Sequence, residues 1–339
     1  MCSFLPTKQP LHFIIVKCSF VIVLAFVKTE LTDIMVIEYL GNKDSIGDIE
    51  GNMQNLHCLH ARFKFKRTPD MLSAGRPDHL LATAGLAVVC NALMVQLVGP
   101  WLLQLFFRER FFPLSLSKQQ WMRKLTMSIM SSALVGTTAV IVYLSEEQLD
   151  PKHLRHDIPT VSFNCAFMLG HTVADTLAHT LLKTNTMTNY FQLILHHIIT
   201  LGASFAGTFS GCLPYYVNIG LMMEVSTVFY CSYIMARELS YLRQSLIIGV
   251  FFLSTFFCVR ILLGFCIFWY HLIPLLQTPE FYDLDLPVLL ALFGCFPVFQ
   301  LLNLVWFPLA CKRYIQDCKS INTPGSISVE KNGLHNKTA

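Results

Sequence analysis

Long apolar stretches separated by short polar loops make up most of the chain after residue 78. A helix needs about 20 mostly apolar residues to cross a bilayer core of about 30 Å. Seven stretches are long enough, at 79–106, 124–144, 159–182, 190–209, 213–235, 245–273 and 286–310. The pattern therefore predicts an all-α, polytopic membrane protein with about seven transmembrane helices, of which 79–106 is the first.

The two ends of the chain have a different pattern. Residues 1–78 are mostly polar, and their one apolar stretch, 11–27, is short and contains Lys17. That stretch is either a signal anchor or an apolar patch. Whether it spans the membrane, and which side the N-terminus faces, is left open. Residues 316–339 predict a flexible tail.

Composition agrees with a membrane protein and excludes several other classes. Only 14% of the 339 residues are charged and 54% are hydrophobic, whereas soluble domains carry about 25% charged residues. The net charge of +4 is small, so we expect no nucleic-acid partner. The twelve cysteines include no Cys-x-x-Cys pair, which excludes a zinc ribbon and a thioredoxin-like site.

Basic residues gather in alternate loops between the apolar stretches. The loop after the first stretch holds Arg108, Arg110 and Lys118, and the tail begins with Lys312 and Arg313. The loops on the other side are acidic or uncharged on balance. Because cytoplasmic loops are enriched in Lys and Arg, we predict that the odd-numbered loops and the C-terminus are cytosolic.

Three ionisable residues in the third stretch, His171, Asp175 and His179, are spaced by four and so share one face of a helix. Ionisable groups inside a span are costly and are candidates for function. Two histidines and a carboxylate on one stripe can bind a metal, line a wet cavity or hydrogen-bond a neighbouring helix. We favour the last two interpretations and predict no metal site.

The fourth stretch carries two adjacent histidines, His196 and His197. Adjacent helical residues point about 100° apart, so the two rings cannot share one direction. His196 shares its face with the polar residues Asn189, Gln192 and Thr200, which predicts that this face turns toward the interior of the bundle. His197 lies on a more apolar face, where we expect it to support its neighbour.

Glu224 and Arg260 fall near the middle of the fifth and sixth stretches. An ion pair between them would neutralise two charges inside the membrane, and we predict this structural pair. Asp175 is the alternative partner for Arg260. Asn303 and Trp306 in the seventh stretch are expected to make hydrogen bonds between helices.

Other classes of membrane protein fit the sequence less well. Di-iron hydroxylases and desaturases need His-x-x-His-His clusters, which the chain lacks. Seven-helix receptors need an Asp/Glu-Arg-Tyr sequence and an Asn-Pro-x-x-Tyr sequence, and neither is found in the corresponding stretches. The prolines that interrupt spans do not occupy matching positions in two halves, as the broken helices of a transporter would.

Motifs in the last four stretches resemble the TLC domain. They are His196-His197-Ile198-Ile199-Thr200, Met223-Glu224-Val225-Ser226-Thr227, Val259-Arg260 and Asn303-Leu304-Val305-Trp306, and Gly170 with Asp175 resembles the Gly-x-x-x-x-Asp of the preceding helix. Lag-type ceramide synthases, translocating-chain-associated membrane proteins and a group of lipid-homeostasis proteins share this domain. The resemblance covers residues 120–315 and implies that the last six helices form a bundle around a central polar cavity.

One departure places the chain nearer to the non-synthase branch of that family. Ceramide synthases have a His-Asp-x-Ser-Asp sequence after the His pair. Met223, Glu224, Ser226 and Thr227 stand at its His, first Asp, Ser and second Asp, so one acidic group is lost. The remaining Glu-x-Ser-Thr resembles the form found in TLC domain-containing proteins that are not synthases.

The resemblance implies a role in membrane lipid homeostasis in the endoplasmic reticulum. Such a protein would bind an acyl lipid, either a sphingolipid or a phospholipid, in its central cavity. The residues expected to line that cavity are Asn189, Gln192, Thr200, Ser226 and Thr227. Membrane lipids are then the partners, and a homo-oligomer is compatible with the sequence.

The alternative implied by the resemblance is a ceramide-synthase-like acyltransferase. It would move a fatty acyl group from acyl-CoA, its co-substrate, to a sphingoid base, and it would need no other cofactor. A histidine can accept the acyl group or remove the proton from the attacking amine. The candidate catalytic residues are His196, His197, Glu224 and Asp175.

Overall fold

The computed structural model describes residues 77–154, 157–181, 190–282, 284 and 286–322. Every regular element in these ranges is a helix. The apolar stretch 11–27, nearly all of the N-terminal segment 1–78, Asn189 and the last part of the tail lie outside the described residues.

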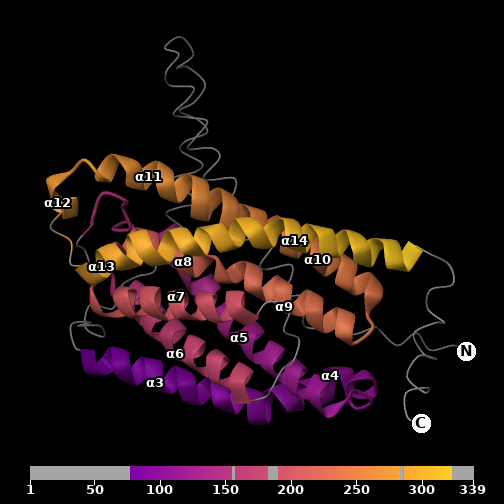
Figure 1. Ribbon diagram of the computed structural model, residues 1–339. Coiled ribbons are helices and arrows are strands. Elements are labelled where there is room, and N and C mark those ends of the chain that lie inside the picture. The colour runs from indigo at the N-terminus through magenta and orange to yellow at the C-terminus, as the bar shows by residue number, and fades with distance from the viewer. Residues whose placement is uncertain (1–76, 155–156, 182–189, 283, 285, 323–339) are drawn as a thin grey trace, which may run out of the picture.

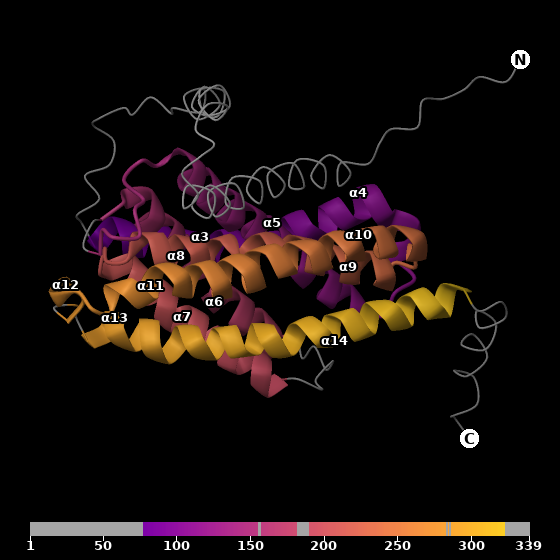
Figure 2. The ribbon, with the colours of Figure 1, turned by 90° about the horizontal axis from the view of Figure 1, so that it is seen from above.

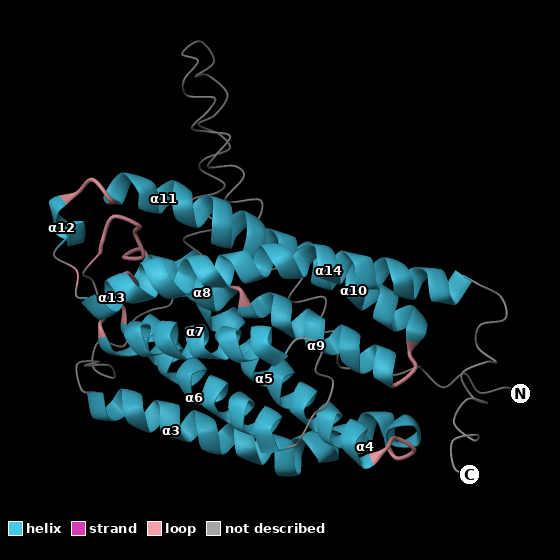
Figure 3. Cartoon of the chain, in the orientation of Figure 1, coloured by secondary structure: helices cyan, strands magenta, loops and turns pink. Residues whose placement is uncertain are grey.

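The first helices are long (Figure 3). Helix α3 (Pro77–Leu93) continues through the π-helical segment η2 (Met94–Val98) into α4 (Gly99–Phe111). Then come α5 (Leu116–Ser145), α6 (Pro159–Leu181) and α7 (Tyr190–Phe209).

The later helices are interrupted more often. Helices α8 (Pro214–Met222) and α9 (Glu224–Glu238) are separated only by Met223. Helix α10 (Leu242–Phe256) passes through the π-helical η3 (Phe257–Ile267) into α11 (Phe268–Leu275). The last elements are α12 (Pro279–Tyr282), α13 (Leu286–Leu290), the π-helical η4 (Ala291–Cys295) and α14 (Phe296–Asn322).

Five helices in the described part of the chain are long and apolar enough to cross a membrane. They are Asp78–Phe111, Leu116–Ser145, Pro214–Glu238, Leu242–Leu275 and Val288–Ser320. The predicted count of seven is not confirmed, because α6 and α7 are not among them. In α6, polar side chains such as His171, Asp175 and His179 lower the mean hydropathy. The five helices support an integral membrane protein.

The long helices lie side by side in one bundle (Figures 1 and 2). Helix α6 packs against α3, α5 and α7, and α5 packs against α9. Helix α14, yellow in both views, contacts α7, α10 and η3. This arrangement places α5 beside α6 and α9, α7 beside α6, and η3 beside α9, and these elements carry most of the polar residues of the predicted spans.

The outer surface of α3 and α4 is apolar. Leu86, Trp101 and Leu105 are exposed there, whereas Asn91 and Leu103 of the same continuous helix are buried against the bundle. An apolar outer face with its polar groups turned inward is the arrangement that a lipid environment favours.

Two glycines allow neighbouring helices to approach closely. A Cβ atom at Gly170 of α6 would lie 2.1 Å from the carbonyl oxygen of Ala84 in α3. A Cβ atom at Gly136 of α5 would lie 2.7 Å from the backbone nitrogen of Val225 in α9. Small residues at helix contacts are typical of membrane bundles.

We expect Gly170→Ala to lower the free energy of unfolding by about 1–3 kcal/mol, because α3 must move away from α6. Gly85→Ala is the control, since a Cβ atom at Gly85 of α3 meets nothing within 4 Å. That substitution should be neutral or stabilising by up to about 1 kcal/mol. Thermal unfolding of both purified variants in detergent tests the expectation, and equal melting temperatures would contradict it.

Candidate functional site

Asp175 of α6 is the centre of a buried charged cluster between α5, α6 and α7. Its Oδ1 lies 2.9 Å from Nζ of Lys124 and accepts a hydrogen bond from Ser128 at 3.3 Å. Its Oδ2 lies 3.2 Å from Nε2 of His197 and 3.8 Å from Nε2 of His179. The four ionisable residues of this cluster are between 4% and 8% exposed, so each depends on the others for its electrostatic partners.

His197 is contacted at both of its ring nitrogens. Nε2 faces Asp175, and Nδ1 lies 2.8 Å from the hydroxyl oxygen of Thr176. The Thr176 hydroxyl also lies 2.7 Å from the carbonyl oxygen of Thr172, to which it can donate. Partners on two sides fix the orientation of an imidazole ring. His197 is therefore held in place on α7 by the side chains of α6.

His196 has a different environment from its neighbour. Its ring stacks on Phe299, with centroids 5.2 Å apart, and meets Trp306 edge-on at 5.5 Å. Its Nδ1 is buried and has no hydrogen-bond partner among the described residues. Buried polar atoms without a partner are uncommon, and the Nδ1 of His196 is such an atom.

His171 belongs to a second polar network. Its Nδ1 lies 3.0 Å from Oδ1 of Asn91, which also accepts a hydrogen bond from Ser131 at 2.7 Å. The network joins α3, α5 and α6. His171 thus shares a helix face with Asp175 and His179 but contacts a different helix. Within the part of the chain that the structure describes, no group of three His, Cys, Asp or Glu residues is placed to hold a metal ion.

Arg260 of η3 is buried and surrounded by acceptors. Its Nε donates to Ser226 at 2.6 Å, its Nη1 donates to Asn303 at 3.1 Å, and its Nη2 donates to Thr227 at 2.9 Å. The same Nη2 lies 3.7 Å from Oε1 of Glu224. The guanidinium therefore forms an ion pair with Glu224, and Asp175 pairs with Lys124 instead.

Glu224 is the first residue of α9, next to the break after α8. Its Oε2 accepts a hydrogen bond of 2.8 Å from Ser132 of α5. Its Oε1 is beyond hydrogen-bond distance from Arg260. Because a carboxylate can accept several hydrogen bonds, Oε1 keeps capacity for a further donor.

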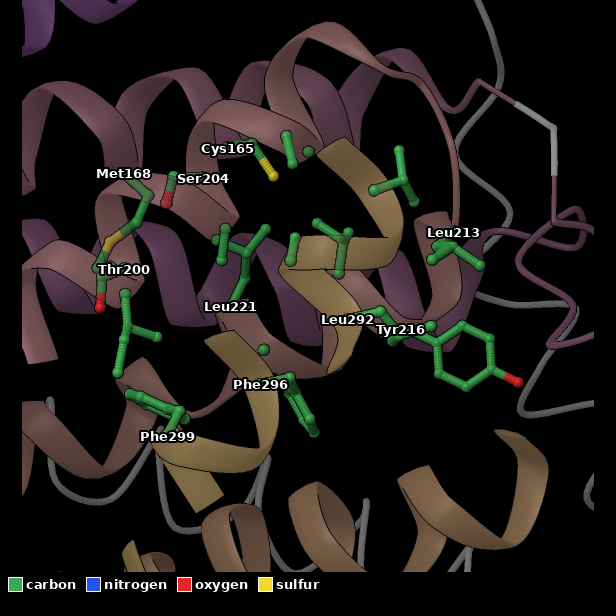
Figure 4. Close-up of a pocket in the computed structure, with 18 of the residues that line it drawn as sticks. Cys165, Met168, Thr200, Ser204, Leu213, Tyr216, Leu221, Leu292, Phe296 and Phe299 are labelled. Atoms are coloured by element: carbon green, nitrogen blue, oxygen red, sulfur yellow. The ribbon is translucent and has the colours of Figure 1, made fainter. Parts of the chain in front are cut away.

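An apolar cavity, part of whose lining is drawn in Figure 4, adjoins Glu224. It lies between α6, α7, α8, α13, η4 and the start of α14. Glu224 is the charged residue in its lining, and Thr200, Ser204 and Ser210 add hydroxyl groups. Most of the remaining surface is hydrocarbon or aromatic, and it includes Cys165, Met168, Leu213, Leu221, Leu292, Phe296 and Phe299.

The structure separates the predicted cavity residues into two sets. Of the predicted cavity residues Thr200 lines the cavity, and so does Glu224, which was predicted as a catalytic candidate and as the partner of Arg260. Gln192, Ser226 and Thr227 do not line it. Gln192 accepts a hydrogen bond from Trp306 at 2.9 Å, and the two hydroxyl groups bind Arg260. The His pair lies outside the lining, with Phe299 in contact with both His196 and the cavity.

Sequence reasoning missed Lys124, Ser132 and Asn91 as members of these networks. Lys124 lies at the edge of a predicted span, where basic residues ordinarily reach into the headgroup region. Helix α5 begins at Leu116, so Lys124 lies about two turns inside the helix. The spacing of Lys124 and Ser128, which share a face four residues apart, is the signal that was present in the sequence.

A family model for the TLC domain matches residues 122–312. This range contains all the site residues described above except Asn91 of α3. It confirms the resemblance inferred from the motifs around the His pair. No curated protein and no solved structure is significantly similar to the chain.

Proposed function

Since the chain belongs to the TLC domain family, we propose that it binds an acyl lipid in its apolar cavity and acts in membrane lipid homeostasis. The cavity is the observation that supports this function. Its lining is mainly hydrocarbon, and Glu224 and Thr200 supply polar groups. Such a surface suits a ligand with one apolar chain and a polar end. We infer that the ligand is a sphingolipid or a phospholipid.

The proposal includes a place in the cell. We assign the protein to the membrane of the endoplasmic reticulum, with its C-terminus in the cytosol. Lys312 and Arg313 at the end of the last span support that orientation, because positive residues remain on the cytoplasmic side. The Glu-x-Ser-Thr sequence that begins at Glu224 supports the non-synthase branch of the family.

Filling the cavity should remove the bound lipid. Ala203 lines the cavity on α7, and Ala203→Phe places a ring in it. We expect the full-length wild type, purified in mild detergent, to retain an acyl lipid that mass spectrometry of the extract identifies. The filled variant should retain about tenfold less, because a well-packed interior has no room for both groups.

The matched control is Ala82→Phe, which adds the same ring to the exposed face of α3. It should retain as much lipid as the wild type. If Ala203→Phe and the wild type carry the same lipid in equal amounts, the ligand lies elsewhere and the proposal fails.

An acyltransferase is the second candidate, and the His pair is the observation that favours it. His197 is held by Asp175 at 3.2 Å, while His196 has a buried Nδ1 without a partner. In this reaction the amine of a sphingoid base attacks the thioester carbonyl, an amide bond forms, and coenzyme A leaves as the thiol. A histidine would take the proton from the attacking amine.

The second candidate predicts ceramide formation from labelled acyl-CoA and a sphingoid base, in membranes that lack other ceramide synthases. The wild type should form the product, and the double variant His196→Ala/His197→Ala should not, at equal expression. No product from the well-expressed wild type would exclude this reaction and leave the lipid-binding function.

A further inference from the structure

Leu213, in the connection between α7 and α8, and Tyr216, in α8, line one end of the cavity. Figure 4 shows Thr200 and Phe299 toward one end of the cavity, and Leu213 and Tyr216 toward the other. Leu213 is 4% exposed and Tyr216 is 3% exposed. Their side chains are therefore packed into the protein at this end of the lining, which we call the wall of the cavity.

Hydrogen bonds to the loop before α6 hold this wall in place. Leu213 has φ 56° and ψ 42°, a left-handed conformation that is unfavourable for a residue with a Cβ atom. Its N–H donates to the carbonyl oxygen of Leu154 at 2.8 Å. The Tyr216 hydroxyl donates to the carbonyl oxygen of Pro151 at 3.4 Å. Strained residues persist only where their surroundings determine them, and they are common beside ligands.

The length of the cavity matches one acyl chain. On α7 and its end the lining runs from Ile199 to Ser210, which is about 15 Å at a helical rise of about 1.5 Å per residue. That is about half of the bilayer hydrocarbon core of about 30 Å, the depth that the chains of one leaflet fill. A chain whose polar end lies near Glu224 would then reach the wall.

We propose that Leu213, supported by Tyr216, sets the maximum length of the acyl chain that the cavity accepts. The inference rests on the proposed function, because it requires an acyl chain in this cavity. A rigid wall gives a sharp limit, since a longer chain must bend or push out residues that are already packed.

The maximum chain length that the cavity accepts can be measured with saturated monoacylglycerols of increasing chain length. Their hydroxyl groups can donate hydrogen bonds to Glu224. Each binds the purified full chain in competition with one fluorescent monoacylglycerol. Affinity for the wild type should rise about fourfold with each added methylene group. It should stop rising at the length at which the chain reaches Leu213.

Two substitutions should move this limit in opposite directions. Leu213→Ala removes three carbon atoms from the wall, which is space for about two more methylene groups. Chains just beyond the wild-type limit should then bind about tenfold more tightly than they bind the wild type. Ala206→Leu adds the same group to the cavity lining on α7 and should shorten the limit by a similar amount.

Leu239→Ala is the matched control, because Leu239 is a buried leucine that does not line the cavity. Its limit should equal that of the wild type. Opposite shifts in Leu213→Ala and Ala206→Leu support the proposal. If Leu213→Ala does not fold, Leu213→Gly takes its place, because glycine adopts the left-handed backbone of this position without strain. A limit that is the same in every variant, with binding intact, overturns the role of Leu213 only. No binding of any chain by folded wild type overturns the proposed function as well.

Discussion

Replacing Lys124 with methionine should lower the free energy of unfolding by about 3–5 kcal/mol. Lys124 is 7% exposed, and its Nζ lies 2.9 Å from Oδ1 of Asp175. Methionine fills much of the same space but brings no charge. The Asp175 carboxylate would remain buried with Ser128 and two histidines as its neighbours. A buried charge that loses its partner is among the most destabilising changes known for single substitutions.

The control for this substitution is Lys118→Met on the same helix. Lys118 forms an ion pair with Glu238 at 3.1 Å, but its side chain is 55% exposed. Exposed pairs contribute about 0–1 kcal/mol, because water and salt screen the charges. Both variants lose one lysine from α5, so the difference between them reports the effect of burial.

Thermal unfolding in detergent measures both effects. We expect Lys124→Met to lower the melting temperature by about 10 °C and Lys118→Met by no more than about 3 °C. Adding Asp175→Asn to Lys124→Met removes the unpaired charge and should restore part of the loss. If the two lysine variants unfold at the same temperature, the cluster around Asp175 does not stabilise the fold.

The lipid environment makes much of this fold predictable. A span must be long and apolar, so the stretches at 79–106, 124–144, 213–235, 245–273 and 286–310 each coincide with a helix that meets these conditions. Helices α6 and α7 occupy the other two stretches. The polar side chains of these two helices find hydrogen-bond and ion-pair partners only after the helices have packed. The hydrophobicity of the sequence therefore predicts these two spans less well.

The candidate site was predictable in part: the pair of Glu224 with Arg260 was expected, whereas Lys124 as the partner of Asp175 was not. Ionisable residues stand out in an apolar span, which is why Asp175, Glu224 and Arg260 were recognised. Which carboxylate faces Arg260 depends on how each helix is rotated about its axis, and the sequence carries little information on that angle. The angle between His196 and His197 follows from helix geometry. The direction of His197 toward Asp175 follows only from the packing of α7 on α6.

One part of the cavity, its wall at Leu213, could not be predicted from sequence patterns. Its polar member Thr200 was foreseen from the stripe of His196, yet its wall at Leu213 lies in the connection between two helices. A left-handed leucine has no sequence signature, because glycine and asparagine are the residues that ordinarily mark this conformation.

Arg260→Met should cost about 3–5 kcal/mol, because it leaves Glu224 buried without a cation. Glu224→Leu should cost less, since the guanidinium keeps the oxygen atoms of Ser226, Thr227 and Asn303. The double variant removes both charges, and its loss should be smaller than the sum by about 0.5–3 kcal/mol. Arg243→Met, at an exposed position, should stay within about 0.5 kcal/mol of the wild type. Losses that add without a coupling would contradict an ion pair in the folded state.

The wild type, the two single variants at Glu224 and Arg260 and the double variant also separate the structural role of Glu224 from a role in lipid binding. Glu224 is paired with Arg260 and also lines the cavity, so a loss of lipid in Glu224→Leu alone has two explanations. In the double variant the unpaired charge is gone, and the fold should recover part of its stability. If the double variant regains stability but retains about tenfold less lipid than the wild type, the carboxylate contacts the polar end of the ligand. If it regains stability and lipid together, Glu224 serves the fold, and the chain is held by the apolar lining alone.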